Sequence, residues 1–211
     1  MKMRLWWQSA RFKTVGLLAG IALAALSAGD GRAEEPQPGA LRVVITAKFT
    51  LPQVSQPIAG SQETVAAAAW KDRGEMRLLS QNQFAALGLD WAALNAKNAA
   101  SAAAELAQIK PELIRDARGV LECAIVHSEG DLTGLTLAPD FLKRFAPLFG
   151  SKLLVAIPDR HTLFIFPKLA SRYPDYAERV LTVYRKSPQP VSREVYEASA
   201  AGLRAIGVYE Q

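Results

Sequence analysis

The chain has 211 residues, half of them hydrophobic, with 25 Lys and Arg, 20 Asp and Glu, two His and one Cys. A single cysteine excludes an internal disulfide, so the fold depends on packing. Residues 1–33 contain five of the basic residues and one acidic residue, which leaves 20 basic and 19 acidic residues in the remainder. The positive charge therefore belongs to the N-terminal segment and does not indicate nucleic-acid binding.

Residues 1–33 follow the plan of a secretory signal peptide. Four basic residues precede an uncharged apolar run from Val15 to Ala28, and small residues follow it. The run has about 14 residues, fewer than the roughly 20 that a spanning helix needs. We therefore expect a bacterial protein that is periplasmic or secreted. It would be attached to a membrane only if the signal segment stayed uncleaved.

Residues 34–62 are expected to form an N-terminal strand and a linker. After the proline-rich lead-in EEPQPGA, the alternation in LRVVITAKF predicts a strand. One face of this strand would present Val43, Ile45, Ala47 and Phe49. The next segment, LPQVSQPIAGSQ, has two prolines and a glycine and predicts a long loop.

A hairpin and two helices are predicted next. The segment TVAAAAWKDRGEMRLLS predicts a strand, a charged turn with a glycine and a second strand. Ser80 and Gln83 have the spacing of a capping box at the start of a short helix, which Gly88 ends. Asp90 is placed to cap a second, alanine-rich helix that ends before Pro111.

The second half of the chain is richer in strands. The segment ELIRDARGVLECAIVHSEGDLTGLTL predicts up to three strands, and PDFLKRFAPLFG predicts an amphipathic helix that Pro147 must kink or end. A hairpin, LLVAIPDRHTLFIF, and an amphipathic helix, PDYAERVLTVYRK, follow. For the tail after Pro190, the pattern leaves a helix and a strand-turn-strand open.

Taken together, these elements predict the α+β class. Strands and helices are mixed without strict βαβ alternation, and adjacent strands are connected as hairpins. We expect a mostly antiparallel sheet with hairpins and several packed helices in a single domain. That domain would span residues 63–211, after the signal peptide (1–33) and the N-terminal strand and linker (34–62).

Three stretches of sequence also have a familiar order and spacing. They are RLLSQNQFAALGLDWAAL, LTLAPDFLKRFAPLFGSKLLVAIPDRHTLFIF and the helix that ends before SPQPVSREVY. From about Gln56 to Ile206 the chain resembles the YtpQ-like family of uncharacterised bacterial proteins. The resemblance implies a single α+β domain and favours strand-turn-strand for the tail. It implies no catalytic residues, because the family is one of unknown function. The export signal and the less acidic charge depart from typical members.

The candidate binding residues are Asp159, Arg160 and His161, at the turn of the second predicted hairpin. Pro158 has the backbone angle of the second position of a type I turn, and Asp159 tolerates the next position. Arg160 and His161 would then project at the tip, where they could bind an anion or a carboxylate. The simpler interpretation is a hairpin turn with soluble residues, and the composition favours it.

No catalytic, metal or cofactor site is predicted. On a strand, Cys123 and His127 would be about 13 Å apart, too far to pair as nucleophile and base. With two histidines and one cysteine, a zinc site would need carboxylates to complete it. Turn composition explains the acidic residues Glu129, Asp131 and Asp159, although two carboxylates there could converge for acid-base work. Aromatic residues at apolar-face positions are expected in the core: Trp70, Trp91, Phe141, Phe145 and Tyr184.

The sequence favours a non-enzymatic exported domain that binds an unknown protein or a small ligand in the cell envelope. Export, the near-neutral charge of the mature chain and the lack of a nucleophile elbow, P-loop, zincin or dinucleotide motif support this hypothesis. The alternative is an uncharacterised hydrolase-type enzyme that uses turn carboxylates or His161. A third reading is a structural role in which residues 52–60 wrap a partner.

Overall fold

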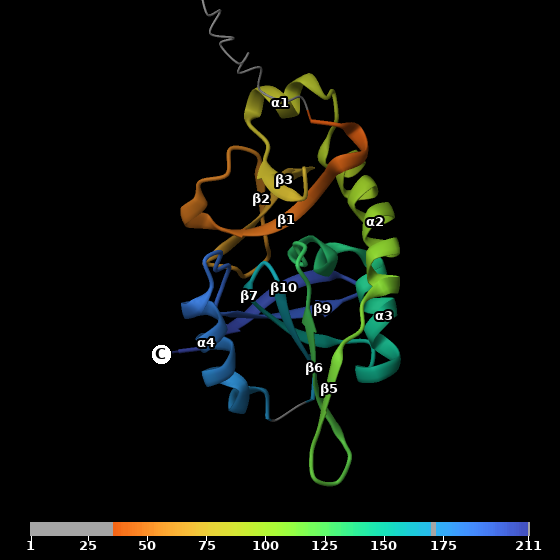
Figure 1. The fold of residues 1–211 in the computed structure, drawn as a ribbon, viewed down its shortest axis with the longest axis vertical. Coiled ribbons are helices and arrows are strands. Elements are labelled where there is room, and N and C mark those ends of the chain that lie inside the picture. The colour runs from red at the N-terminus through yellow and green to blue at the C-terminus, as the bar shows by residue number, and fades with distance from the viewer. Residues whose placement is uncertain (1–35, 170–171, 211) are drawn as a thin grey trace, which may run out of the picture. The chain divides into compact units, whose positions relative to one another are not determined.

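The structure is a computed structural model that describes residues 36–169 and 172–210, so the predicted signal peptide lies outside the described residues. This part of the chain contains four α-helices and two antiparallel sheets (Figure 1). The predicted α+β class with antiparallel pairing is confirmed. Instead of one sheet there are two, a four-stranded sheet from the first half of the chain and a six-stranded sheet from the second.

The four-stranded sheet is built around β3, which pairs with β1 along one edge and with β2 and β4 along the other. Its strands are β1 (Leu41–Ala47), β2 (Ser55–Pro57), β3 (Thr64–Asp72) and β4 (Glu75–Leu78). Both faces of β1 are buried, since Val43, Val44 and Ile45 are all inaccessible. Phe49 does not share the predicted face: β1 ends at Ala47, and the Phe49 side chain is 67% exposed.

Two helices follow this sheet, α1 (Gln81–Ala86) and α2 (Trp91–Gln108). Both predicted starts are confirmed. Ser80 and Gln83 form the reciprocal capping box, and the Asp90 side chain accepts a hydrogen bond from Ala93 N. Every fourth residue of α2 from Leu94 to Leu106 is buried, which gives the helix one face against β1.

The six-stranded sheet has the order β10-β9-β7-β8-β6-β5, and every pair in it is antiparallel. Its strands are β5 (Glu112–Arg115), β6 (Leu121–His127), β7 (Leu153–Asp159), β8 (Thr162–Pro167), β9 (Glu194–Ser199) and β10 (Gly202–Val208). The tail is therefore a strand-turn-strand, as the family resemblance favoured. The segment Thr133–Leu137, predicted as part of a third strand, is a 3-10 turn. The Thr133 amide donates to Asp131 Oδ1, and the Thr133 hydroxyl accepts from Ile45 N of β1, so side-chain hydrogen bonds replace the backbone ladder of a strand.

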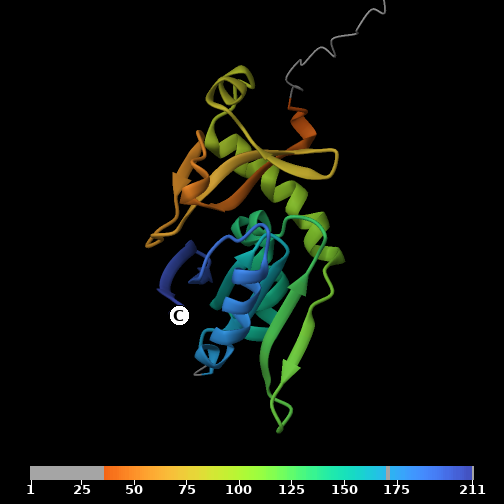
Figure 2. The same ribbon diagram turned by 60° about the vertical axis from the view of Figure 1, so that its left-hand side comes forward.

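Helices cover the two faces of this sheet, α3 (Pro139–Phe149) on one and α4 (Ala177–Lys186) on the other (Figures 1 and 2). Side chains of β7 alternate between them: Leu153 and Val155 pack with the phenylalanines of α3, and Leu154 packs with α4. The central strands β7 and β8 are thus buried on both faces. Pro147 lies in the last turn of α3, which ends two residues later.

Side chains from other elements cover the backbone edge of β1. The amide of Val43 donates to Asn98 Oδ1 of α2 at 3.1 Å, and the amide of Ile45 donates to Thr133 Oγ1 at 3.0 Å. Gly134 lies so close to β1 that a Cβ atom there would be 2.1 Å from Val43 O. The turn before α3 therefore joins the four-stranded sheet to the rest of the fold.

Candidate functional site

The predicted binding residues lie at the β7–β8 turn, but the turn is shifted from its predicted position. Ile157, Pro158 and Asp159 belong to β7, and the turn residues are Arg160 and His161. Pro158 lies at a register shift in the β7–β8 pairing, and its carbonyl accepts from Val191 N at 2.9 Å. A proline suits this place because the irregular pairing leaves its missing N–H without consequence.

The tip does not project as expected, because it packs against residues 128–132. The carbonyls of Arg160 and His161 accept hydrogen bonds from the amides of Leu132 (2.8 Å) and Ser128 (3.1 Å). His161 Nδ1 lies 3.1 Å from the carbonyl oxygen of Gly130. Both turn residues are only partly accessible. The backbone of the turn is therefore hydrogen bonded to residues 128–132 and connects this segment to the β7–β8 hairpin.

The charged groups of the turn also have internal partners. The Asp159 carboxylate is buried and accepts from His161 N at 3.0 Å. The guanidinium of Arg160 reaches the Met76 carbonyl at 3.5 Å and Asp131 Oδ2 at 3.8 Å. A binding role for Asp159, Arg160 and His161 stays a prediction, and any ligand would compete with these contacts.

Asp131 is the most perturbed carboxyl group of this region. Its Oδ1 accepts from Thr133 N and Thr133 Oγ1, at 2.9 and 2.6 Å. Burial raises the pKa of Asp131, and the hydrogen bonds from Thr133 and the charge of Arg160 oppose this only in part. The neighbouring acid Glu129 is exposed. The two turn carboxylates are thus in different environments, one inside the fold and one in solvent.

Cys123 and His127 do not form a nucleophile-base pair. Cys123 is fully buried among the side chains that pack under α4, and burial raises the pKa of its thiol to about 12. His127 is exposed at the end of β6, and its Nδ1 lies 3.3 Å from Thr162 Oγ1. In the described residues, no three His, Cys, Asp or Glu side chains come together as metal ligands.

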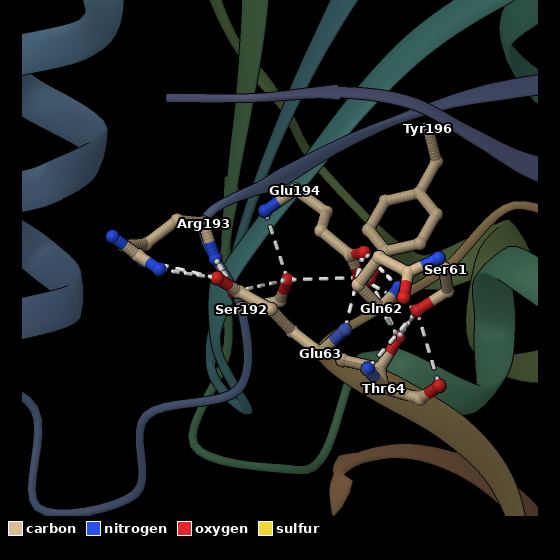
Figure 3. Close-up of polar contacts among 8 residues, drawn as sticks. All are labelled: Ser61, Gln62, Glu63, Thr64, Ser192, Arg193, Glu194 and Tyr196. Atoms are coloured by element: carbon tan, nitrogen blue, oxygen red, sulfur yellow. Dashed lines mark hydrogen bonds and ion pairs between the residues drawn. The ribbon is translucent and has the colours of Figure 1, made fainter. Parts of the chain in front are cut away.

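The densest polar cluster lies elsewhere, around Glu194 at the start of β9 (Figure 3). Its Oε2 accepts from Ser61 Oγ at 2.7 Å and from Tyr196 OH at 2.9 Å. Its Oε1 accepts from the amides of Gln62 and Glu63, at 2.6 and 3.2 Å. Burial by itself raises the pKa of Glu194, but these hydrogen bonds together hold the pKa below its ordinary value.

A second carboxylate strengthens the same junction. Glu63 forms an ion pair with the guanidinium of Arg193 and accepts from Arg193 N at 2.9 Å. Glu194 of β9 thus contacts the loop before β3, and Glu63 of that loop contacts Arg193 next to β9 (Figure 3). Each oxygen of Glu194 already has at least two donors. This cluster is built to join the two sheets, and it leaves little capacity for a substrate.

Beside this junction, a cleft of about 760 Å³ opens between the two halves of the fold. Its walls come from β2 and β3, from α2, from the start of α3 and from the β9–β10 turn. Most of the lining is apolar, and many of its residues are small. The alanines in it are Ala59, Ala66, Ala96, Ala99, Ala138, Ala198 and Ala200.

Few of the described side chains that line the cleft are polar. Gln56, Asn95 and Ser199 supply uncharged polar side chains, and the hydroxyl of Thr136 already donates to the Thr133 carbonyl at 2.7 Å. Among the described residues, Lys143 is the one charged residue in the lining. The cleft therefore has the character of a ligand pocket, which is mostly apolar with a few placed polar groups.

The aromatic predictions hold for Trp70, Phe141 and Phe145, which are buried. Trp91 differs, because it is only partly buried and lines the cleft while its ring lies 6.1 Å from that of Phe84. Tyr184 is also only partly buried. Sequence reasoning missed the cleft because small residues leave no mark in a pattern of apolar positions.

Comparison of the chain with protein-family models, with curated proteins and with solved structures found no match. The resemblance to the YtpQ-like family therefore stays a prediction. Within residues 36–169 and 172–210, no helix combines the length and apolar character that crossing a membrane requires.

Proposed function

We propose that this protein is a non-enzymatic binding domain of the cell envelope and that the cleft holds a small, mainly apolar ligand. The observation that carries the proposal is the cleft itself, with its volume of about 760 Å³ and one charged residue in its lining. Small-molecule sites have volumes of roughly 300 to 1,000 Å³ and bury most of the ligand against apolar walls. The export pattern of residues 1–33 supports the cellular location.

The composition of the lining supports binding in preference to chemistry. General acid-base or nucleophilic catalysis needs a titratable or nucleophilic group beside the ligand. Within the part of the chain that the structure describes, the lining offers Lys143 and the hydroxyls of Ser199 and Thr136, and no carboxylate, histidine or cysteine. The perturbed groups Glu194, Asp131 and Cys123 are not part of the lining. A ligand in the cleft would be held by apolar contact.

A fluorescent apolar probe tests this proposal. We expect the full chain to bind N-phenyl-1-naphthylamine with a rise in emission, because the dye fluoresces strongly in apolar surroundings. Ala99→Phe would fill the cleft from α2 and abolish most of the rise. The matched control is Ala100→Phe, since Ala100 is the next residue of the same helix, exposed and outside the lining. Equal emission from both variants, with both folded by circular dichroism, would overturn the proposal.

A further inference from the structure

We infer that the ligand of the cleft is an amphipathic carboxylate, with its alkyl chain along the apolar walls and its carboxylate at Lys143. The inference rests on the proposed function and names the chemical class of its ligand. Three features carry it: the sign of the single charge among the described lining residues, the way that this charge is held, and the small number of polar side chains along the walls.

The charge in the lining is positive, and its ion-pair partner Asp140 lies outside the lining. Lys143 lies in α3, one turn after the helix starts at Pro139, and both residues line the cleft. None of the described residues that line the cleft has an acidic side chain. A lysine at the edge of an apolar cavity attracts an anion and repels a cation. The charge complementarity therefore favours an acidic headgroup.

Lys143 is available to a ligand although it has a partner. Its Nζ lies 2.7 Å from Asp140 Oδ1, with the two side chains 76% and 35% exposed. Exposed pairs of this kind contribute little to stability, so a ligand displaces or shares the lysine at small cost. The ammonium group has three N–H donors, and Asp140 engages one of them. Asp140 thus moderates the affinity for an anion and provides a way to test it.

The walls favour an alkyl chain over a peptide. An extended peptide would find few polar side chains in the described lining, so its backbone groups would depend on the backbone of the walls for hydrogen-bond partners. Strand addition along β10 is also blocked beside the cleft, because the amide of Ala205 already donates to the Ala59 carbonyl at 2.8 Å. An alkyl chain makes no such demand, and apolar walls such as Ile58, Phe141 and Leu203 suit it.

Three probes with the same chain and different headgroups separate charge from apolar contact. Dodecanoate, dodecan-1-ol and dodecylammonium are each titrated into the full chain with N-phenyl-1-naphthylamine bound. The two ionic probes stay below their micelle concentrations, and the alcohol stays below its solubility limit. We expect dodecanoate to displace the dye at an about threefold to fivefold lower concentration than the other two, because an ion pair with this exposed lysine contributes modestly to affinity. Lys143→Gln should remove this preference, and Lys143→Glu should transfer it to dodecylammonium. Asp140→Asn should increase it.

The matched control is Lys186→Gln, which removes an exposed lysine at the end of α4, away from the cleft. It should leave the preference unchanged. If dye binding responds to Ala99→Phe but the three probes compete equally, the ligand class is wrong and the binding proposal stands. If the dye does not bind, both fail. Displacement by the uncharged peptide acetyl-(Val-Ala)₃-amide, with no displacement by the three alkyl probes, would identify a peptide groove and overturn the inference.

Discussion

The carboxylate of Glu194 accepts a hydrogen bond from the Ser61 hydroxyl at 2.7 Å, across 133 residues of sequence. Ser61 precedes β3 of the four-stranded sheet, and Glu194 begins β9 of the six-stranded sheet. The same carboxylate accepts hydrogen bonds from the Tyr196 hydroxyl and from two backbone amides of the loop before β3. One side chain thus satisfies donors from both sheets. Such a buried network is most costly when one member is changed and the others are left unpaired.

We predict that Glu194→Gln lowers the free energy of unfolding by about 1 to 3 kcal/mol. Glutamine has nearly the same shape, but its NH₂ group faces donors where the carboxylate presented an acceptor. Urea denaturation followed by circular dichroism measures the effect. Glu129→Gln is the control, because Glu129 is exposed and should change stability by less than about 0.5 kcal/mol. Equal stability of the two variants would show that the network does not hold the sheets together.

The pH dependence of stability should carry the signature of Glu194. Because its pKa in the folded protein lies below the ordinary value of 4.5, the ionised carboxylate stabilises the fold above that pH. This contribution is lost as the pH falls through the lower, folded-state pKa. We therefore expect the stability of the wild-type chain to fall more steeply than that of Glu194→Gln between about pH 5 and about pH 3. Parallel curves would contradict the pKa shift.

Gly134→Ala should destabilise the joint between β1 and the turn before α3. A Cβ atom at Gly134 would lie 2.1 Å from the Val43 carbonyl oxygen, so the backbone must move. Overpacking of this kind costs typically about 1 to 3 kcal/mol, which thermal or urea unfolding resolves. Gly207→Ala is the matched control, since a Cβ there meets nothing within 4 Å. If both variants unfold alike, the close approach at Gly134 is not needed.

Cys123 should be unreactive in the folded protein. Its side chain is fully buried and burial raises the pKa of the thiol to about 12, so little thiolate exists at pH 8 and reagents cannot reach it. We expect no labelling by the aromatic disulfide dithiobis(nitrobenzoate) in the native state and one labelled thiol per chain after unfolding in urea. Rapid labelling of the native protein would place Cys123 outside the core.

Elements whose causes are local could be predicted from the sequence. Ser80 and Asp90 cap their helices because each needs only an amide three residues away. Gly88 ends α1 with a φ of +61°, which glycine adopts without strain. The amphipathic stripes of α3 and α4 predicted faces that the structure buries against the six-stranded sheet.

Predictions failed where a distant segment takes over the hydrogen bonds. Pro158 has the residue type of a turn, but Val191 and Ser192 bond to the β7 backbone there and keep it in the strand. Thr133 is β-branched and suits a strand, yet its hydroxyl bonds to β1 and holds a 3-10 turn. In both places the local preference is worth less than a set of tertiary hydrogen bonds.

The sequence by itself determined the helices, the caps of α1 and α2, the α+β class and the expectation of export, because these depend on residues close together in the chain. The strand β2 lies in a segment predicted as a loop, and it forms only because β3 pairs with it. Only the tertiary structure decided that the strands divide into two sheets, that Glu194 joins them and that the turn at Arg160 is packed inside the fold. It also decided where the cleft forms, because its walls come from elements far apart in the sequence, from β1 to β10. These features depend on contacts between segments far apart in sequence, and such contacts form only when the whole chain folds together.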